Sequence, residues 1–116
     1  MRVRQADLED GPWPYDGHVF DAIVVTNYLF RPRLDALLAS VGPDGVLIYE
    51  TFMLGNERHG RPANPKFLLR PGELLARLVR GWTIVAFEQG EVSSPRPAVI
   101  QRVCAIRGER TTRLPA

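Results

Sequence analysis

Apolar runs and polar breaks alternate along the chain at a spacing typical of an α/β domain. Residues 20–26, Phe-Asp-Ala-Ile-Val-Val-Thr, form a β-branched run that shows no polar alternation after Asp21. Such a run predicts a central parallel strand covered on both faces, and residues 45–50 have the same character. Between them, residues 33–40 carry leucines at helical spacing, and Pro32 suits the first turn of a helix. The order strand, helix, strand predicts a βαβ unit with a right-handed crossover.

The second half of the chain begins with a long polar segment, residues 51–67, broken by glycines and prolines. Loops of this length are unusual unless they are functional or mobile, and we predict that this one is the most mobile internal segment. Residues 70–81 predict a helix that ends at a glycine. Residues 82–88 and 98–107 predict two strands joined by a loop, and therefore antiparallel. Residues 108–116 are expected to form a loose tail.

Composition narrows the possible functions. The 116 residues fit one small domain, which we place at residues 1–107. The net charge is only +2 and the arginines are scattered, which argues against a nucleic-acid surface. No apolar run is long enough for a signal peptide or a membrane span, so we expect a cytoplasmic protein that does not bind membranes. Cys104 is the single cysteine and is interpreted as a buried small hydrophobe. With only two distant histidines beside it, no metal site is expected.

Four phrases, in this order, resemble a known family: QADLEDGPWP, FDAIVVTNYLF, GPDGVLIYETF and FLLRPGELLARLVRGWTIVAFEQGEV. Together they resemble the C-terminal half of a class I S-adenosylmethionine-dependent methyltransferase, most of all the small bacterial methyltransferase-domain or tellurite-resistance-like proteins. The resemblance implies an α/β fold, a partial Rossmann-like doubly wound sheet. It would hold strands 4-5-7-6 of the methyltransferase fold and end in an antiparallel hairpin. The implied activity is methyl transfer from S-adenosylmethionine to a small-molecule acceptor.

Two parts of that family's pattern are absent from this sequence. The family has a Gly-x-Gly-x-Gly loop after its first strand and a ribose-binding acid after its second, and neither occurs here. We therefore expect an incomplete enzyme that binds S-adenosylmethionine weakly or not at all. The chain would then be a truncated product, have a misplaced start, or depend on a partner for the missing N-terminal half.

The missing first strand would also leave one edge of the strand at residues 20–26 unpaired. An unpaired apolar edge favours a homodimer that pairs edge to edge, unless residues 1–6 fold back to cover it. The alternative function is therefore a non-enzymatic interaction domain that self-associates through this edge.

The resemblance also assigns roles to residues at the cofactor. Asp7 and Leu8 stand where the family reads the adenine ring, although Asp7 also fits an ordinary acidic loop. Asn27, Tyr28 and Leu29 leave the strand at residues 20–26, where the family lines the methionine moiety and the acceptor. Ligands of open α/β sheets bind outside the carboxyl ends of the strands, which agrees with that position. The alternative is a polar strand cap with Tyr28 packed on the loop.

Two further side chains are candidates for acid–base work. Glu50 ends its strand on the same edge, where it would position or deprotonate an acceptor, or else only cap a loop. His59 lies in the long polar loop and is either a general base or a solvated side chain. The sulfonium of the cofactor already makes the methyl group electrophilic, so alignment and exclusion of water matter more than a fixed triad.

Overall fold

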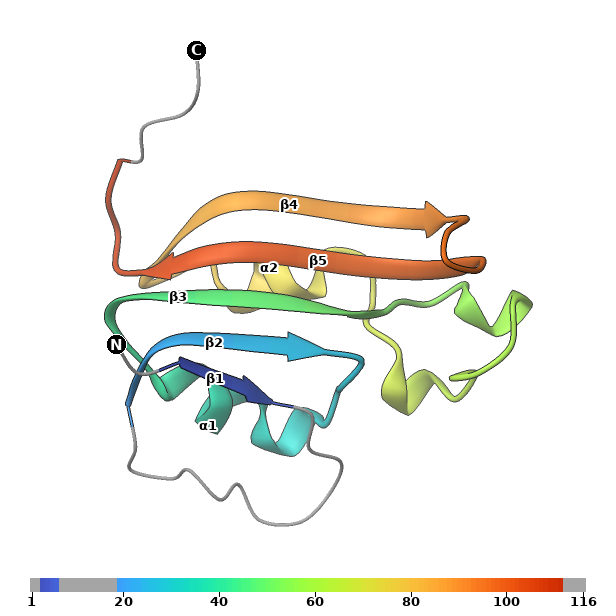
Figure 1. Ribbon diagram of the computed structural model, residues 1–116, viewed down its shortest axis with the longest axis horizontal. Coiled ribbons are helices and arrows are strands. Elements are labelled where there is room, and N and C mark those ends of the chain that lie inside the picture. Colours follow the sequence, from blue (N-terminus) through green and yellow to red (C-terminus); the bar gives the residue numbers. More distant parts are fainter. Residues whose placement is uncertain (1–2, 7–18, 112–116) are drawn as a thin grey trace.

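Within the described residues, 3–6 and 19–111, five β-strands form one mixed sheet with two α-helices packed against it (Figure 1). Across the sheet of this computed structural model the order is β1-β2-β3-β5-β4. Strands β1, β2 and β3 are parallel, and β5 is antiparallel to both β3 and β4. The elements are β1 Val3–Ala6, β2 Phe20–Thr26, α1 Arg31–Ala39, β3 Val41–Phe52, α2 Glu73–Arg77, β4 Trp82–Val92 and β5 Ala98–Arg107, with 3₁₀ turns η1 Asn56–Arg58 and η2 Pro65–Phe67. The predicted α/β class is confirmed.

Strands β2 and β3 flank α1, as the sequence pattern predicted, but β3 is longer than expected. It begins at Val41 rather than at residue 45, because Val41 pairs with Phe20 at the start of β2. Residues 43–45, Pro-Asp-Gly, lie inside the strand as an irregularity. There Asp44 adopts a left-handed φ of 64°, and the register against β2 shifts between Phe20 and Ala22. A bulge of this kind bends a strand without ending it.

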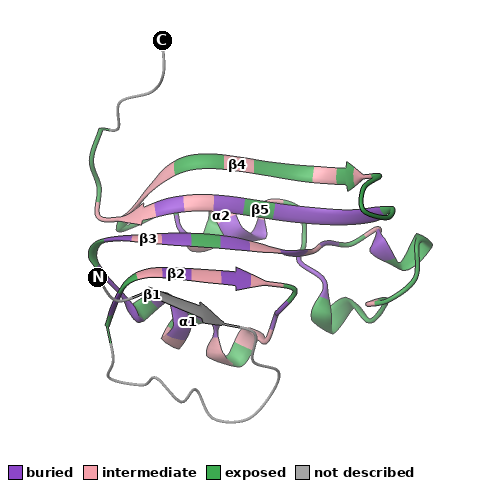
Figure 2. Cartoon of the chain, viewed as in Figure 1, coloured by how far each residue is buried: buried purple, intermediate pink, exposed green. Residues whose placement is uncertain are grey.

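Both helices cover the same face of the sheet. In Figure 1 they lie behind the strands, and their leucines join alternate strand residues in the core: Ile23, Val25, Leu47, Tyr49, Val103, Leu34, Leu37, Leu74 and Leu78. On the other face, Val24 and Val46 are half-buried and Ile48 is 45% exposed. Figure 2 shows that the edge strand β4 is half-buried or exposed along its length, whereas β5 beside it is largely buried.

The prediction that β2 is covered on both faces is therefore wrong for the described residues. The crossovers β2-α1-β3 and β3-α2-β4 advance in the same direction across the sheet. Since such crossovers are right-handed as a rule, both helices fall on one side. Cys104 belongs to the uncovered face and is only half-buried, which corrects its interpretation as a buried residue.

The edge of β2 that we expected to be unpaired has a partner. Strand β1 runs parallel to it, from Val3 opposite Ala22 to Ala6 opposite Val25. The sequence-based case for edge-to-edge pairing through β2 is therefore wrong. The alternative that we had named, in which the N-terminal residues cover that edge, is what the structure shows.

Helix α2 is shorter than predicted. It spans only Glu73–Arg77, within the predicted 70–81, because Gly72 takes a left-handed φ of 71° immediately before it. Gln101, fully buried in β5, accepts the backbone N–H of Leu74 at 2.8 Å and donates to the carbonyl of Arg70 at 3.0 Å.

No helix in the described part of the chain is long and apolar enough to cross a membrane.

Candidate functional site

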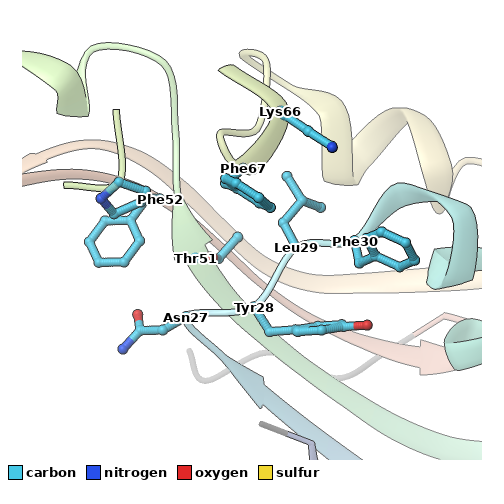
Figure 3. A pocket seen from close by; sticks show the side chains of 9 residues that line it. Asn27, Tyr28, Leu29, Phe30, Thr51, Phe52, Lys66 and Phe67 are labelled. Atoms are coloured by element: carbon cyan, nitrogen blue, oxygen red, sulfur yellow. The ribbon is translucent and has the colours of Figure 1, made fainter. Parts of the chain in front are cut away.

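A cavity of about 440 Å³ opens at the carboxyl ends of β2 and β3. The residues that line it follow these two strands or come from the loop above them: Asn27, Tyr28, Leu29, Phe30, Thr51, Phe52, Pro62, Lys66 and Phe67. Figure 3 shows Lys66 and Phe67 on one side of the cavity and Asn27 and Tyr28 on the other. Its walls are largely apolar, and among the described residues that line it Lys66 is the only charged one.

The floor of the cavity is the exit of β2. Asn27 has a left-handed φ of 54°, a conformation that asparagine tolerates better than most residues, and its N–H donates to the Glu50 carbonyl at 3.0 Å. This turn directs Tyr28 and Leu29 inward, and each is only 5% exposed. The fully buried Tyr49 hydroxyl donates to the Tyr28 carbonyl at 2.6 Å. Burial raises the pKa of Tyr49, so the hydroxyl stays a hydrogen-bond donor at every physiological pH.

The roof of the cavity is η2, and Arg31 holds it in place. The Arg31 guanidinium donates to the carbonyls of Lys66 at 3.1 Å and Leu68 at 2.7 Å. It also donates to both carboxylate oxygens of Glu73, at 2.8 and 2.7 Å. Asn64 caps η2 by accepting the N–H of Lys66 at 3.0 Å. One residue at the start of α1 thus connects the cavity roof to α2.

Glu73 is the buried partner in this arrangement, with a side chain only 5% exposed. Burial alone would raise the pKa of Glu73, but the hydrogen bonds from Arg31 and from the Arg70 backbone outweigh it and lower the pKa below the ordinary value. The hydrogen bond to Glu73 in turn raises the pKa of Arg31. The pair is therefore ionised whenever the protein is folded near neutral pH.

A second cavity of about 230 Å³ lies next to the first. Phe52 lines both, and the adjacent residues Arg61 and Pro62 line one cavity each. The residues of the second cavity are Phe52, Asn56, His59, Gly60, Arg61, Arg96, Pro97 and Ala98. Asn56 is 2% exposed and fixes its wall, since its Oδ1 accepts the Val99 N–H at 3.0 Å and its Nδ2 donates to the Pro62 carbonyl at 3.1 Å.

The structure brings only some of the predicted site residues together. Asn27, Tyr28 and Leu29 meet in the first cavity. His59 lines the second, where its Nε2 lies 2.6 Å from a carboxylate oxygen of Glu91. Asp7 and Leu8 lie outside the described residues.

Glu50 lines neither of these two cavities. Its side chain is on the uncovered face of the sheet, where Arg102 donates to it at 3.2 Å and to Glu88 at 2.6 Å. A strand alternates its faces residue by residue, so Glu50 and its neighbour Thr51, which does line the cavity, point in opposite directions.

Sequence reasoning missed the roof of the site. Lys66, Phe67 and Arg31 belong to no motif, and Arg31 meets Glu73, which is 42 positions away in the sequence. The sequence offered one indirect indication of the roof, because Lys66 is the only lysine in the chain and lies at the end of the long loop.

Comparison with known proteins gives matches in structure only. No family model matches the chain, and no curated protein matches it. The N-methyltransferase NodS from Bradyrhizobium japonicum WM9 matches with a TM-score of 0.57 and 18% identity, over 79% of this chain and 53% of that one. A structure from work on the conversion of a disulfide bond into a thioacetal group during echinomycin biosynthesis matches with a TM-score of 0.54 and 15% identity, over 78% of this chain and 50% of that one.

These identities establish a likeness of fold alone. The chain spans about half the length of the two structures that it matches. It has a methyltransferase-like fold, and the cavity described above lies at the carboxyl ends of its parallel strands.

Proposed function

We propose that this chain forms the acceptor-side half of an S-adenosylmethionine-dependent methyltransferase acting on a small molecule. The observation that carries the proposal is the position of the first cavity, at the carboxyl ends of two adjacent parallel strands in a methyltransferase-like sheet. Ligands of open α/β sheets bind at such ends. In this assignment β2, β3, β5 and β4 correspond to strands 4, 5, 7 and 6 of the family, and β4 and β5 to its terminal hairpin.

The described residues fit the acceptor side of such a site better than the cofactor side. Asn27 and Leu29 stand where the methionine moiety would lie, but no glycine-rich turn follows a described strand to admit the rest of the cofactor. We infer that a further polypeptide segment supplies this turn and the ribose-binding acid. The two matched structures, each about twice the length of the aligned region, support that inference.

In this role the residues of the chain position the acceptor and exclude water. Leu29, Phe52 and Phe67 offer apolar walls to an acceptor, and the Asn27 side chain offers a hydrogen-bonding amide at the rim. When bound, the cofactor supplies an electrophilic methyl group. Alignment of two reactants in a dry site contributes most of the acceleration for chemistry of this kind.

The proposal is tested by titrating the ¹⁵N-labelled chain with S-adenosylhomocysteine. We expect amide shifts at Asn27, Leu29 and Thr51, with a dissociation constant weaker than about 100 µM because the glycine-rich turn is missing. The variant Phe67→Ala changes an exposed wall residue and should alter these shifts, whereas Val79→Ala, outside the cavity and 72% exposed, should not. Shifts confined to other parts of the chain would contradict the assignment of the first cavity to the cofactor and acceptor. A dissociation constant in the low-micromolar range would contradict the inference that this chain lacks part of the cofactor site.

The alternative function, an interaction domain that pairs through the edge of β2, has lost the observation on which it rested. Strand β1 occupies that edge in the structure. No described feature now favours it over methyl transfer.

A further inference from the structure

Among the described residues, those that line the second cavity include two arginines and no carboxylate. Arg61 and Arg96 approach it from two segments far apart in the sequence, and His59 joins them. Within the described part of the chain, neither guanidinium is engaged in an ion pair. Glu91, whose side chain is 60% exposed, contacts His59 but is not among the residues that line the cavity. Two arginines without acidic partners in one concave surface form a ready site for an oxyanion.

The wall that carries these cations is fixed rather than loose. The buried Asn56 connects the Pro62 carbonyl to the Val99 N–H and so joins the Arg61 side of the cavity to the start of β5. On the other side, Arg96 stands two residues before Ala98, which is buried and pairs with Val92. Anchored backbone on both sides lowers the entropy lost when the guanidinium groups close on a ligand.

The two cavities are neighbours with complementary character. The first is about 440 Å³ and mostly apolar, and Lys66 is the only charged residue in its described lining, while the second is about 230 Å³ and carries two arginines. Phe52 and the adjacent Arg61 and Pro62 separate them. A single small molecule with an apolar or aromatic body and an anionic group matches this pair of surfaces.

We propose that Arg61 and Arg96 bind the carboxylate or phosphate group of the methyl acceptor, whose apolar body occupies the first cavity. The identification of the ligand as the acceptor rests on the proposed function. The oxyanion site itself rests only on the two arginines and their cavity. The chemistry shared by carboxylate and phosphate is a planar or tetrahedral oxyanion that accepts two or more N–H bonds from a guanidinium group.

The oxyanion site is tested first with small probes. The ¹⁵N-labelled chain is titrated with inorganic phosphate and, separately, with acetate at constant ionic strength, while the backbone amides and the arginine Nε–H signals are followed. We expect saturable shifts at Gly60, Ala98 and the Nε–H groups of Arg61 and Arg96. Whichever probe saturates at the lower concentration identifies the preferred oxyanion.

Variants make the test specific. Arg61→Gln and Arg96→Gln should each weaken the binding of the preferred probe about tenfold, since each removes one charged donor pair. Arg80→Gln is the matched control, because Arg80 is exposed and lines no cavity. Both arginines of the site are exposed, so these variants should fold, which their amide spectra will show directly. Linear, non-saturating shifts that are equal in all three variants would mean an adventitious ion only and would overturn the site.

The link between the two cavities is tested with phenyl phosphate and benzoate. If one acceptor fills both, these compounds should bind about tenfold more tightly than phosphate or acetate, because an aromatic ring is buried. They should also shift Leu29 and Phe67 together with Ala98. Shifts at the second cavity alone would overturn the shared acceptor while the oxyanion site stands. A failure of S-adenosylhomocysteine to reach Asn27 would instead count against the proposed function and leave the phosphate and acetate results unaffected.

Discussion

At the scale of single residues, Tyr49 joins the core to the site through one hydrogen bond. Its hydroxyl is the donor to the Tyr28 carbonyl at 2.6 Å, in a place that water does not reach. Tyr49→Phe leaves that carbonyl buried without this donor, and we expect a loss of about 1–3 kcal/mol in the free energy of unfolding. Urea denaturation measures it. A change below about 0.5 kcal/mol would mean that the Tyr28 carbonyl has another donor.

The second residue-scale prediction concerns the Arg31–Glu73 pair. Arg31→Gln leaves the buried Glu73 carboxylate without its main partner and should cost about 3 kcal/mol. The control is Arg77→Gln, which breaks the pair with Asp35, a residue whose side chain is 91% exposed. Exposed pairs contribute about 0–1 kcal/mol. Equal losses in the two variants would contradict the role given to Arg31, and the amide of Phe67 should shift only in Arg31→Gln.

The same pair predicts how stability depends on pH. The folded pKa of Glu73 is lowered from 4.5, so the unfolded chain takes up this proton at a higher pH than the folded chain does. The contribution of Glu73 to stability is therefore complete above the unfolded pKa and is lost as pH falls through the folded one. Glu73→Gln should flatten the fall in unfolding free energy as the pH decreases below the ordinary pKa of a glutamate. Identical slopes in the two proteins would contradict the lowered pKa.

At the scale of elements, the sequence pattern predicted correctly those strands whose limits are determined by the residues within and next to them. The strand at residues 20–26 and the strand at residues 98–107 have the predicted bounds, because β-branched side chains and a turn suffice to define them. Helix α2 is much shorter than its leucine pattern indicated, since Gly72 and the Gln101 side chain determine where it begins. Tertiary contacts of this kind leave no periodic trace in a sequence.

In the candidate site, likewise, only the part that directly follows a predicted strand could be predicted from the sequence. The exit of β2 followed from the position of Asn27, Tyr28 and Leu29 after a buried strand. The face on which Glu50 lies was not foreseen, because residues 46–49 before it are all apolar and no polar alternation marks the inward face of the strand. The roof depends on Arg31, whose partners are all distant in the sequence, so only the folded chain reveals it.

The long loop allows an element-scale prediction that the structure sharpens. Residues 51–67 were predicted to be the most mobile internal segment, yet Met53 and Leu54 donate to the carbonyls of Val99 and Leu69 at 2.9 Å each. We expect slow amide exchange at these two residues and fast exchange at Ala63 and Asn64, which are exposed and follow the Pro62 carbonyl held by Asn56. Exchange followed by NMR at neutral pH measures both. Uniform protection across the loop would contradict its division into an anchored base and a mobile tip.

At the scale of the whole molecule, one face of the sheet has no helix over it within the described residues. We define this open face by the outward residues of β2, β3 and β5: Ala22, Val24, Val46, Ile48, Cys104 and Ile106. Sheets with parallel strands are normally covered on both sides, and contiguous exposed apolar surface marks an interaction site. The open face, rather than the edge of β2, is therefore where we expect association.

The last prediction is that the isolated chain forms a dimer through this open face. Beside the apolar residues, Arg102 lies between Glu50 and Glu88, so the face carries both signs of charge. A two-fold dimer across this face would bury both apolar surfaces, and a face that carries both signs of charge is compatible with a self-complementary contact. Sedimentation at tens of micromolar should give twice the chain mass of 13.0 kDa.

Ile48→Glu should restore the monomer with little loss of stability, since Ile48 is already 45% exposed. Val79→Glu, at a residue 72% exposed on the helix side, should leave the dimer intact. A wild-type monomer that persists at this concentration would refute the dimer. A dimer that survives Ile48→Glu would show that the contact lies elsewhere on the molecule.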